Sequence, residues 1–229
     1  MINGLSAIYK MDQLTFKFPF FKKFYEQDFF VSTNNFSAFK LIDNWPKWPG
    51  KWLNIYGEKG SGKTHLSKIL EKKIYKTKLI EANKINNSII EDLNNLDCLI
   101  IDSFKNNIDE KLLYSILNQS KQLDNFILIN SKISIKNVEF RLEDLKSRIN
   151  SFIFIGIELP TDDLLKVVIS KMLSEKQITI KPKLTEFIIN NVERSYEKMF
   201  KFLKELDEIS LSTGKSININ LIKKVLKNE

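Results

Sequence analysis

Short apolar runs alternate with helical patterns through the first two thirds of the chain. These runs are rich in isoleucine, leucine and phenylalanine and have polar ends, which is typical of buried strands. Strands are predicted at 52–56, 78–82, 98–101, 126–129 and 152–157. Helices are predicted within 29–44 and at 63–75, 109–123 and 138–149. Ser32, Thr33 or Asn34 would cap the first helix. Strands that alternate with helices predict βαβ units and a mostly parallel sheet, so the expected fold class is α/β.

The strand signals stop near Leu159-Pro160-Thr161. Beyond this point the pattern is helical, at 162–175, 184–193, 195–212 and from about 220. Thr161, Asp162 and Asp163 are typical of a helix start, because acidic side chains are favoured at the positive end of a helix. We therefore expect three segments: an arm (1–25), an α/β domain (26–158) and a small helical domain (159–229).

The net charge of +8 comes almost entirely from lysines spread along the chain. This composition indicates a solvated surface, which permits weak contact with DNA without requiring it. The chain has one cysteine and no apolar run near the roughly 20 residues that span a bilayer. Its first ten residues do not resemble a signal peptide. We therefore expect a soluble cytoplasmic protein that does not bind membranes.

The strongest motif is Gly-Glu-Lys-Gly-Ser-Gly-Lys-Thr at 57–64, between a predicted strand and a predicted helix. It satisfies the full phosphate-loop pattern GxxxxGK[ST]. Glycines let backbone N–H groups turn toward phosphate oxygens, and the positive end of the following helix favours the anion. Lys63 would reach the β- and γ-phosphates and Thr64 would ligate Mg²⁺. The expected ligand is ATP or ADP with Mg²⁺, bound by Gly57, Gly60, Ser61, Gly62, Lys63, Thr64 and His65. A packed ring is the better interpretation of His65, the only histidine, than a catalytic one.

Polar residues follow two of the predicted strands. Asp102 ends the run 98–101, where a carboxylate can hold Mg²⁺, although a helix cap is the alternative. Ser103 comes next, where many ATPases place a second acid that activates water. Serine cannot act as that base at neutral pH, so unaided hydrolysis should be slow. Asn130 and Ser131 end the strand 126–129 and are candidate catalytic residues beside the γ-phosphate, or else a strand-end turn.

Only three arginines occur in this lysine-rich chain, at 141, 148 and 194. Arginine makes planar, multi-donor contacts with phosphate that lysine does not make. Arg148 ends a predicted helix at an edge that would face a neighbouring subunit, so it is a candidate finger for another molecule's γ-phosphate. A surface salt bridge is the alternative. Arg194 lies at the start of the long helix of the second domain, from which it would reach the phosphates of a nucleotide bound at the loop. Arg141 is expected to be structural.

Three stretches resemble the AAA+ family, and within it the branch of DnaA and the Hda-type regulators. They are Gly57–Leu66 (GEKGSGKTHL), Cys98–Ser103 (CLIIDS) and Leu145–Ile149 (LKSRI). Asp43–Gly50 and Glu193–Ser195 look like the Hda-type proteins of alphaproteobacteria, and the resemblance extends from about Gln13 to the end of the chain. It implies a parallel αβα sandwich with a phosphate loop and a carboxy-terminal helical lid.

The resemblance also implies partners. DnaA continues past the lid with a helix-turn-helix domain that reads origin DNA, for which we expect no room in 229 residues. Hda-type proteins begin with a motif that docks on the beta subunit of the DNA polymerase sliding clamp, and residues 13–18 (QLTFKF) look like it. Gln13, Leu14, Phe16 and Phe18 would be its anchors, or else part of a packed arm. Such a regulator would present Arg148 to ATP held by DnaA, and it is compatible with a homo-oligomer.

Two departures from the family pattern weaken the case for an independent ATPase. Ser103 replaces the second acid, and the lid arginine of many relatives falls near Glu197, with Arg194 one turn earlier.

Two other functions stay open. One is a helicase loader of the DnaC type, which is an AAA+ ATPase that binds single-stranded DNA. The other is a small-molecule kinase, although no motif indicates an acceptor pocket.

Overall fold

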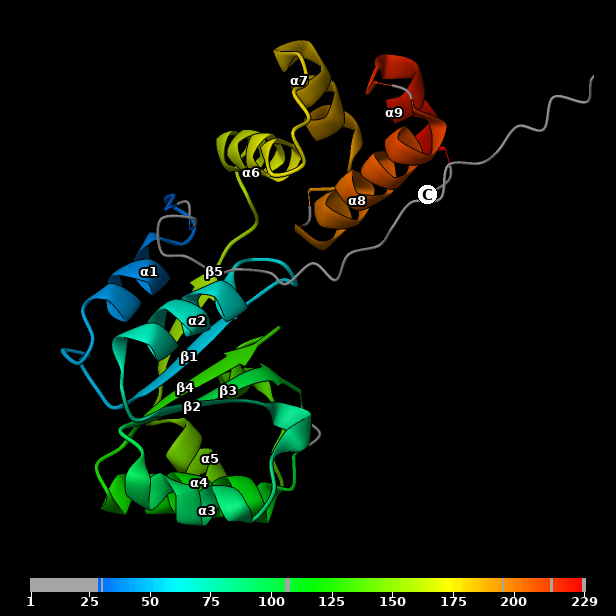
Figure 1. The fold of residues 1–229 in the computed structure, drawn as a ribbon. Coiled ribbons are helices and arrows are strands. Elements are labelled where there is room, and N and C mark those ends of the chain that lie inside the picture. Colours follow the sequence, from blue (N-terminus) through cyan, green and yellow to red (C-terminus); the bar gives the residue numbers. More distant parts are fainter. Residues whose placement is uncertain (1–28, 30, 106–107, 195, 215, 228–229) are drawn as a thin grey trace, which may run out of the picture.

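The computed structural model describes residues 29, 31–105, 108–194, 196–214 and 216–227. Within them, five parallel strands form one sheet (Figure 1). The strands are β1 (Trp52–Gly57), β2 (Thr77–Glu81), β3 (Cys98–Phe104), β4 (Phe126–Ser131) and β5 (Ile153–Ile157). They lie in the order β2-β3-β4-β1-β5. Because the strands are parallel, the segments that follow β1, β3 and β4 meet at one edge of the sheet.

Helices cover both faces of this sheet (Figure 1). The α-helices are α1 (Phe36–Asp43), α2 (Lys63–Lys73), α3 (Ser88–Asp92), α4 (Glu110–Gln122) and α5 (Glu143–Ile149). Short 3-10 turns are η2 (Ala82–Lys84), η3 (Leu93–Asn95) and η4 (Ile135–Asn137). Cys98 and Ile100 of β3 pack with α1 and α2, whereas Leu99 and Ile101 pack with α3, α4 and α5. Successive side chains of β3 therefore enter two apolar layers, which is why the strand reads as a continuous apolar run.

After β5 the chain forms a helical lid with a core of its own. Its helices are α6 (Asp162–Ser174), α7 (Pro182–Asn191), α8 (Tyr196–Thr213) and α9 (Ile219–Leu226). Ile169, Ile188, Phe202 and Ile222 are fully buried in this core, which is separate from the two layers that flank the sheet. Thr161 caps α6 as predicted, because its hydroxyl accepts a hydrogen bond from the backbone N–H of Leu164.

The linker between β5 and the lid begins beside the end of β1, because Gly57 pairs with Ile157. Asn34 holds this linker through three hydrogen bonds. Its side-chain amide donates to the carbonyl oxygen of Leu159 at 2.8 Å and to the Glu158 carboxylate at 3.5 Å. Its backbone carbonyl oxygen accepts the N–H of Glu158 at 3.3 Å. The lid is thereby attached next to the loop that follows β1.

The predicted helix at 138–149 was wrong in its first part, because α5 begins only at Glu143. Val138 is extended, and the backbone N–H groups of Arg141 and Leu142 donate to the Glu110 carboxylate at 2.8–3.0 Å. These bonds lower the pKa of Glu110. They satisfy backbone donors that would otherwise need helical partners, so the segment stays irregular up to α5.

The predicted cap of α1 was also wrong. The N-cap residue is Asn35, whose side-chain oxygen accepts the backbone N–H of Ser32 at 2.8 Å and makes no capping bond to the helix. No helix within the described ranges is long and apolar enough to span a bilayer.

Candidate functional site

The segment between β1 and α2 forms the phosphate loop, and two of its glycines are required by its geometry. Gly62 directly precedes α2 with φ of 100°, in the left-handed region. A Cβ atom there would lie 2.9 Å from the ring of Phe29, and one on Gly57 would lie 2.6 Å from the carbonyl oxygen of Ile157. Any larger side chain at either position would displace the loop.

Lys63 turns its ammonium group back toward the loop. Its Nζ donates to three loop oxygens: the carbonyls of Gly57 at 2.7 Å and Glu58 at 2.8 Å, and Oγ of Ser61 at 3.1 Å. Burial lowers the pKa of Lys63 to about 8, although the charges of Asp102 and Glu58 oppose the shift. The charge of Lys132 adds to the lowering. Phosphate oxygens can replace these three acceptors, so the lysine is well placed for an anionic ligand.

Polar side chains from α2, β3 and β4 meet beside Lys63. Thr64 Oγ1 donates to Asp102 Oδ2 at 2.8 Å. Asn130 Nδ2 donates to Asp102 Oδ1 at 2.9 Å and to Ser67 Oγ at 2.7 Å. Asp102 is 6% exposed and Asn130 is fully buried. The structure thus brings Thr64, Asp102 and Asn130 together from three separate segments of the sequence.

This cluster fits an Mg²⁺ ion that binds together with a nucleotide. Mg²⁺ takes oxygen ligands and usually keeps several waters, so one hydroxyl and one carboxylate suffice when phosphate oxygens complete the shell. In the described part of the chain, Oδ1 of Asn130 is buried without a hydrogen-bond partner. A buried acceptor of this kind is normally satisfied by water or a ligand. The hydroxyl of Thr64 and the carboxylate of Asp102 are therefore the oxygen groups that would hold a metal bound together with phosphate.

The two serines near this cluster lie in different environments. Ser103 is exposed, has φ of 57°, and lies where the β3–β4 register shifts. Ser131 is buried, accepts a hydrogen bond from Asn54 Nδ2 at 2.9 Å and donates to the carbonyl oxygen of Ile133 at 2.6 Å. The Ser131 hydroxyl thus joins β1 to the turn after β4, whereas Asn130 points to Asp102.

Two residues that the sequence analysis did not single out, Phe29 and Lys132, also border the loop. The ring of Phe29 stacks on Phe39 at 5.7 Å between centroids and makes an edge contact with His65 at 5.4 Å. Lys132, the residue after β4, places Nζ 3.2 Å from the Glu58 carboxylate. Of these, only Lys132 had a sequence signal, because it follows the polar residues that end β4.

The fold is similar to that of solved DnaA structures. Domain III of the Thermotoga maritima replication initiation protein DnaA matches with a TM-score of 0.74 at 20% identity, covering 88% of this chain and 95% of that one. AMPPCP-bound DnaA from Aquifex aeolicus matches with a TM-score of 0.65 at 18% identity, covering 79% and 64%. In sequence, DnaA of Chlorobaculum tepidum is 24% identical over 199 residues, which are 77% of this chain but 40% of that relative.

Two family models match separate parts of the chain. Residues 53–144 match the model described as RNA helicase, a stretch that runs from β1 into α5 and contains the phosphate loop. Residues 165–226, most of the lid, match the model described as Hda, lid domain. These matches support the predicted resemblance to the AAA+ family, in the branch of DnaA and Hda. The fold is the predicted one, an α/β phosphate-loop core with a helical lid.

Arg148 lies in α5, close to the start of β5. Its Nε donates to Oδ1 of Asn118 in α4 at 2.8 Å, and the side chain is half-buried. A guanidinium has five N–H donors, so this bond orients the group and uses one of them.

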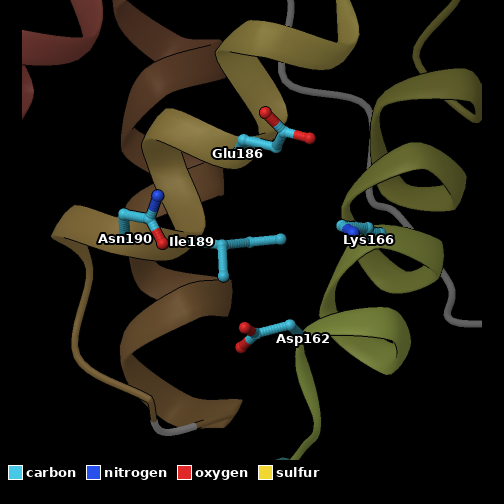
Figure 2. A pocket seen from close by; sticks show the side chains of 5 residues that line it. All are labelled: Asp162, Lys166, Glu186, Ile189 and Asn190. Carbon is cyan, nitrogen blue, oxygen red and sulfur yellow. The ribbon is translucent and has the colours of Figure 1, made fainter.

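Arg194 lies before α8 and pairs with the first residue of α6. Its NH2 atom is 3.0 Å from Oδ1 of Asp162, and its side chain is 61% exposed. Asp162 lines a cavity of about 120 Å³ between α6 and α7, together with Lys166 and Glu186 (Figure 2). The lid therefore holds Arg194 against Asp162 at the start of α6.

The remaining predicted site residues are those of the clamp motif. Gln13, Leu14, Phe16 and Phe18 lie outside the described residues. Docking of this chain on a sliding clamp therefore stays a prediction.

Proposed function

We propose that this chain is a nucleotide-binding regulator of replication initiation that docks on the sliding clamp and stimulates ATP hydrolysis by DnaA. The observation that carries the proposal is the match of residues 165–226 to the Hda lid domain, in a chain that also has a complete phosphate loop. The AMPPCP bound by DnaA of Aquifex aeolicus supports ATP or ADP as the ligand.

In this proposal, the nucleotide phosphates bind at the loop between β1 and α2. Lys63 and the backbone N–H groups at the start of α2 neutralise the phosphate charge. Thr64 and Asp102 hold Mg²⁺, which, when bound, adds positive charge at the terminal phosphates. Asn130 keeps Asp102 in place and offers its free amide oxygen to water. Ser103 supplies no base, so the chain turns over ATP slowly by itself and acts mainly as a nucleotide-dependent binding protein.

Arg148 acts on ATP that DnaA holds. Its guanidinium would stabilise the charge that develops on the transferred phosphate, a contribution worth about 10³–10⁵ in rate. The bond from Nε to Asn118 keeps the planar group in one orientation and leaves its terminal N–H groups for phosphate. Asn118 is thus a positioning residue for the arginine.

The test measures phosphate released by DnaA–ATP with loaded clamp, after addition of the wild-type protein, Arg148→Ala or Arg148→Lys. Both variants should lose stimulation while they keep nucleotide binding, because lysine lacks the planar fork. Arg141→Ala is the matched control and should stimulate normally. Full stimulation by Arg148→Ala would remove the arginine from the mechanism, and fast turnover by this protein alone would favour a helicase loader.

Clamp docking is tested separately through the amino-terminal motif. The double variant Gln13→Ala, Leu14→Ala removes one polar and one apolar anchor. Clamp pull-down should decrease strongly, while nucleotide affinity stays at the wild-type value. If the double variant binds the clamp as well as the wild type, residues 13–18 are only an arm.

A further inference from the structure

Side chains of other elements hold the connection between β4 and α5 at both of its ends. Near β4, the fully buried Asn54 of β1 accepts the backbone N–H of Ile135 at 3.0 Å. Near α5, the carboxylate of Glu110, the first residue of α4, accepts three hydrogen bonds. Its Oε2 accepts the N–H groups of Arg141 at 2.9 Å and Leu142 at 2.8 Å, and its Oε1 accepts that of Arg141 at 3.0 Å. The connection is thus held to β1 at one end and to α4 at the other.

The helix that follows this connection depends on such an anchor. α5 has seven residues, and isolated helices shorter than about 12 residues are marginal in water. The residue directly before it, Leu142, has an apolar side chain that cannot cap the helix. The sequence pattern also favours a helix from 138 onward, so local residues do not decide where α5 begins. Glu110 takes the two N–H groups that precede α5 and thereby sets its first turn.

The place where α5 begins decides where Arg148 points. Leu145 and Ile149 bury one side of α5 in the core. Such apolar contacts are non-directional, so they do not by themselves fix the rotation of a short helix. With 3.6 residues per turn, a change of one residue in the start of the helix turns each side chain by about 100°. Nε of Arg148 donates to Oδ1 of Asn118 at 2.8 Å, so α4 holds α5 before its first residue and again in its last turn.

We propose that Glu110 is a positioning residue for Arg148, which holds α5 in the one position that presents the guanidinium to a nucleotide bound by a partner protein. The inference rests on the proposed stimulation of ATP hydrolysis by DnaA. Glu110 acts through the backbone of residues 141 and 142 and does not itself meet phosphate. The neighbouring acid, Asp109, serves α4 instead, because its carboxylate accepts the N–H of Leu112 at 2.8 Å.

The test measures phosphate release by DnaA–ATP with loaded clamp as the concentration of this protein is raised. Glu110→Ala should lower the maximal rate about 10–100-fold, because a misplacement of about 1 Å can cost about 10²-fold. The concentration that gives half of the maximal rate should not change. Partial unfolding would do the opposite, since more protein would be needed but the maximal rate would be reached. Glu110→Gln should keep much of that rate, because its amide oxygen can replace Oε2, which accepts both N–H groups.

Asp109→Asn is the matched control, since it removes the same charge one residue earlier and keeps an oxygen that can cap α4. It should stimulate like the wild type. The double variant Glu110→Ala, Arg148→Ala should be no worse than Arg148→Ala alone, because Glu110 acts only through the arginine. Hydrogen exchange at the amides of Arg141 and Leu142 should be faster in Glu110→Ala.

An unchanged maximal rate in Glu110→Ala would overturn the proposal. So would a loss that Asp109→Asn reproduces, or a further loss when Glu110→Ala is added to Arg148→Ala. If the wild-type protein does not stimulate DnaA, the proposed function itself fails and Glu110 has no reaction to serve. That result is distinct from a wild type that stimulates DnaA and a Glu110→Ala variant that stimulates it equally well.

Discussion

Replacing Lys63 by methionine should stabilise the nucleotide-free protein while it abolishes nucleotide binding. Methionine keeps an unbranched side chain of similar length and removes the charge. Burial is the main reason that the pKa of Lys63 falls from 10.5 to about 8. At neutral pH Lys63 is charged in both states, but the folded protein binds the lysine proton less strongly than the unfolded chain does. The charge on Lys63 therefore destabilises the folded protein.

The size of the gain follows from the pKa shift. One pKa unit corresponds to about 1.4 kcal/mol, so the lowering from 10.5 to about 8 sets an upper limit of about 3.5 kcal/mol. Lys63 is partly exposed, and methionine leaves three oxygen acceptors to water, so we expect about 1–2 kcal/mol. Because the folded pKa lies below the unfolded one, this penalty is complete below pH 8 and disappears as the pH rises to 10.5.

The assay is urea denaturation of nucleotide-free protein at pH 7 and at pH 9.5, followed by circular dichroism. The difference in unfolding free energy between Lys63→Met and the wild type should favour the variant at pH 7 and decrease at pH 9.5. Because both proteins contain the same other lysines, the contribution of those lysines to the pH dependence of the unfolding free energy cancels in this difference. A variant that is less stable at pH 7, or a difference that does not change with pH, would refute the reasoning. Calorimetry should detect no AMPPCP binding by the variant.

Three further predictions concern the site and the lid. Asp102→Asn should remove most of the Mg²⁺ dependence of AMPPCP affinity, because the carboxylate that would hold the ion is lost; calorimetry with and without Mg²⁺ checks this, and an unchanged dependence contradicts it. Gly62→Ala should lower the unfolding free energy by about 1–2 kcal/mol through its positive φ and its contact with Phe29, as urea denaturation would measure. Phe202→Ala should cost about 3–5 kcal/mol and speed hydrogen exchange in the lid alone, whereas a uniform increase would argue against a separate lid core.

The periodic elements of the fold could be predicted from sequence because each carries its signal locally. The runs that became β3 and β4 are apolar on both faces, and Thr161 stands directly before the helix it caps. The predicted helix at 138–149 failed because the deciding contact is remote. Glu110 lies 31 residues from Arg141 in sequence and captures its backbone N–H, which no local pattern reveals.

The candidate site likewise contains residues that the local sequence predicts and contacts that it does not predict. Lys63, Thr64 and Asp102 could be found because a phosphate loop has a fixed spacing and a parallel sheet gathers its strand ends at one edge. The position of Lys132 after the polar end of β4 is visible in the sequence, but its pairing with Glu58 is not, since a lysine after a strand is typical of solvated surface in a chain with this composition. The pairing of Arg194 with Asp162 depends on how α6 and α8 pack in the lid, which the residue types do not specify.

The hydrogen bonds of Asn34 couple the lid to the segment before α1. Asn34 holds Glu158 and Leu159 of the linker, and Phe29, five residues earlier, packs against His65 in α2. A lid that turned about this linker would have to break the Asn34 bonds or carry the residues before α1 with it, so the lid position and the surroundings of the phosphate loop would change together.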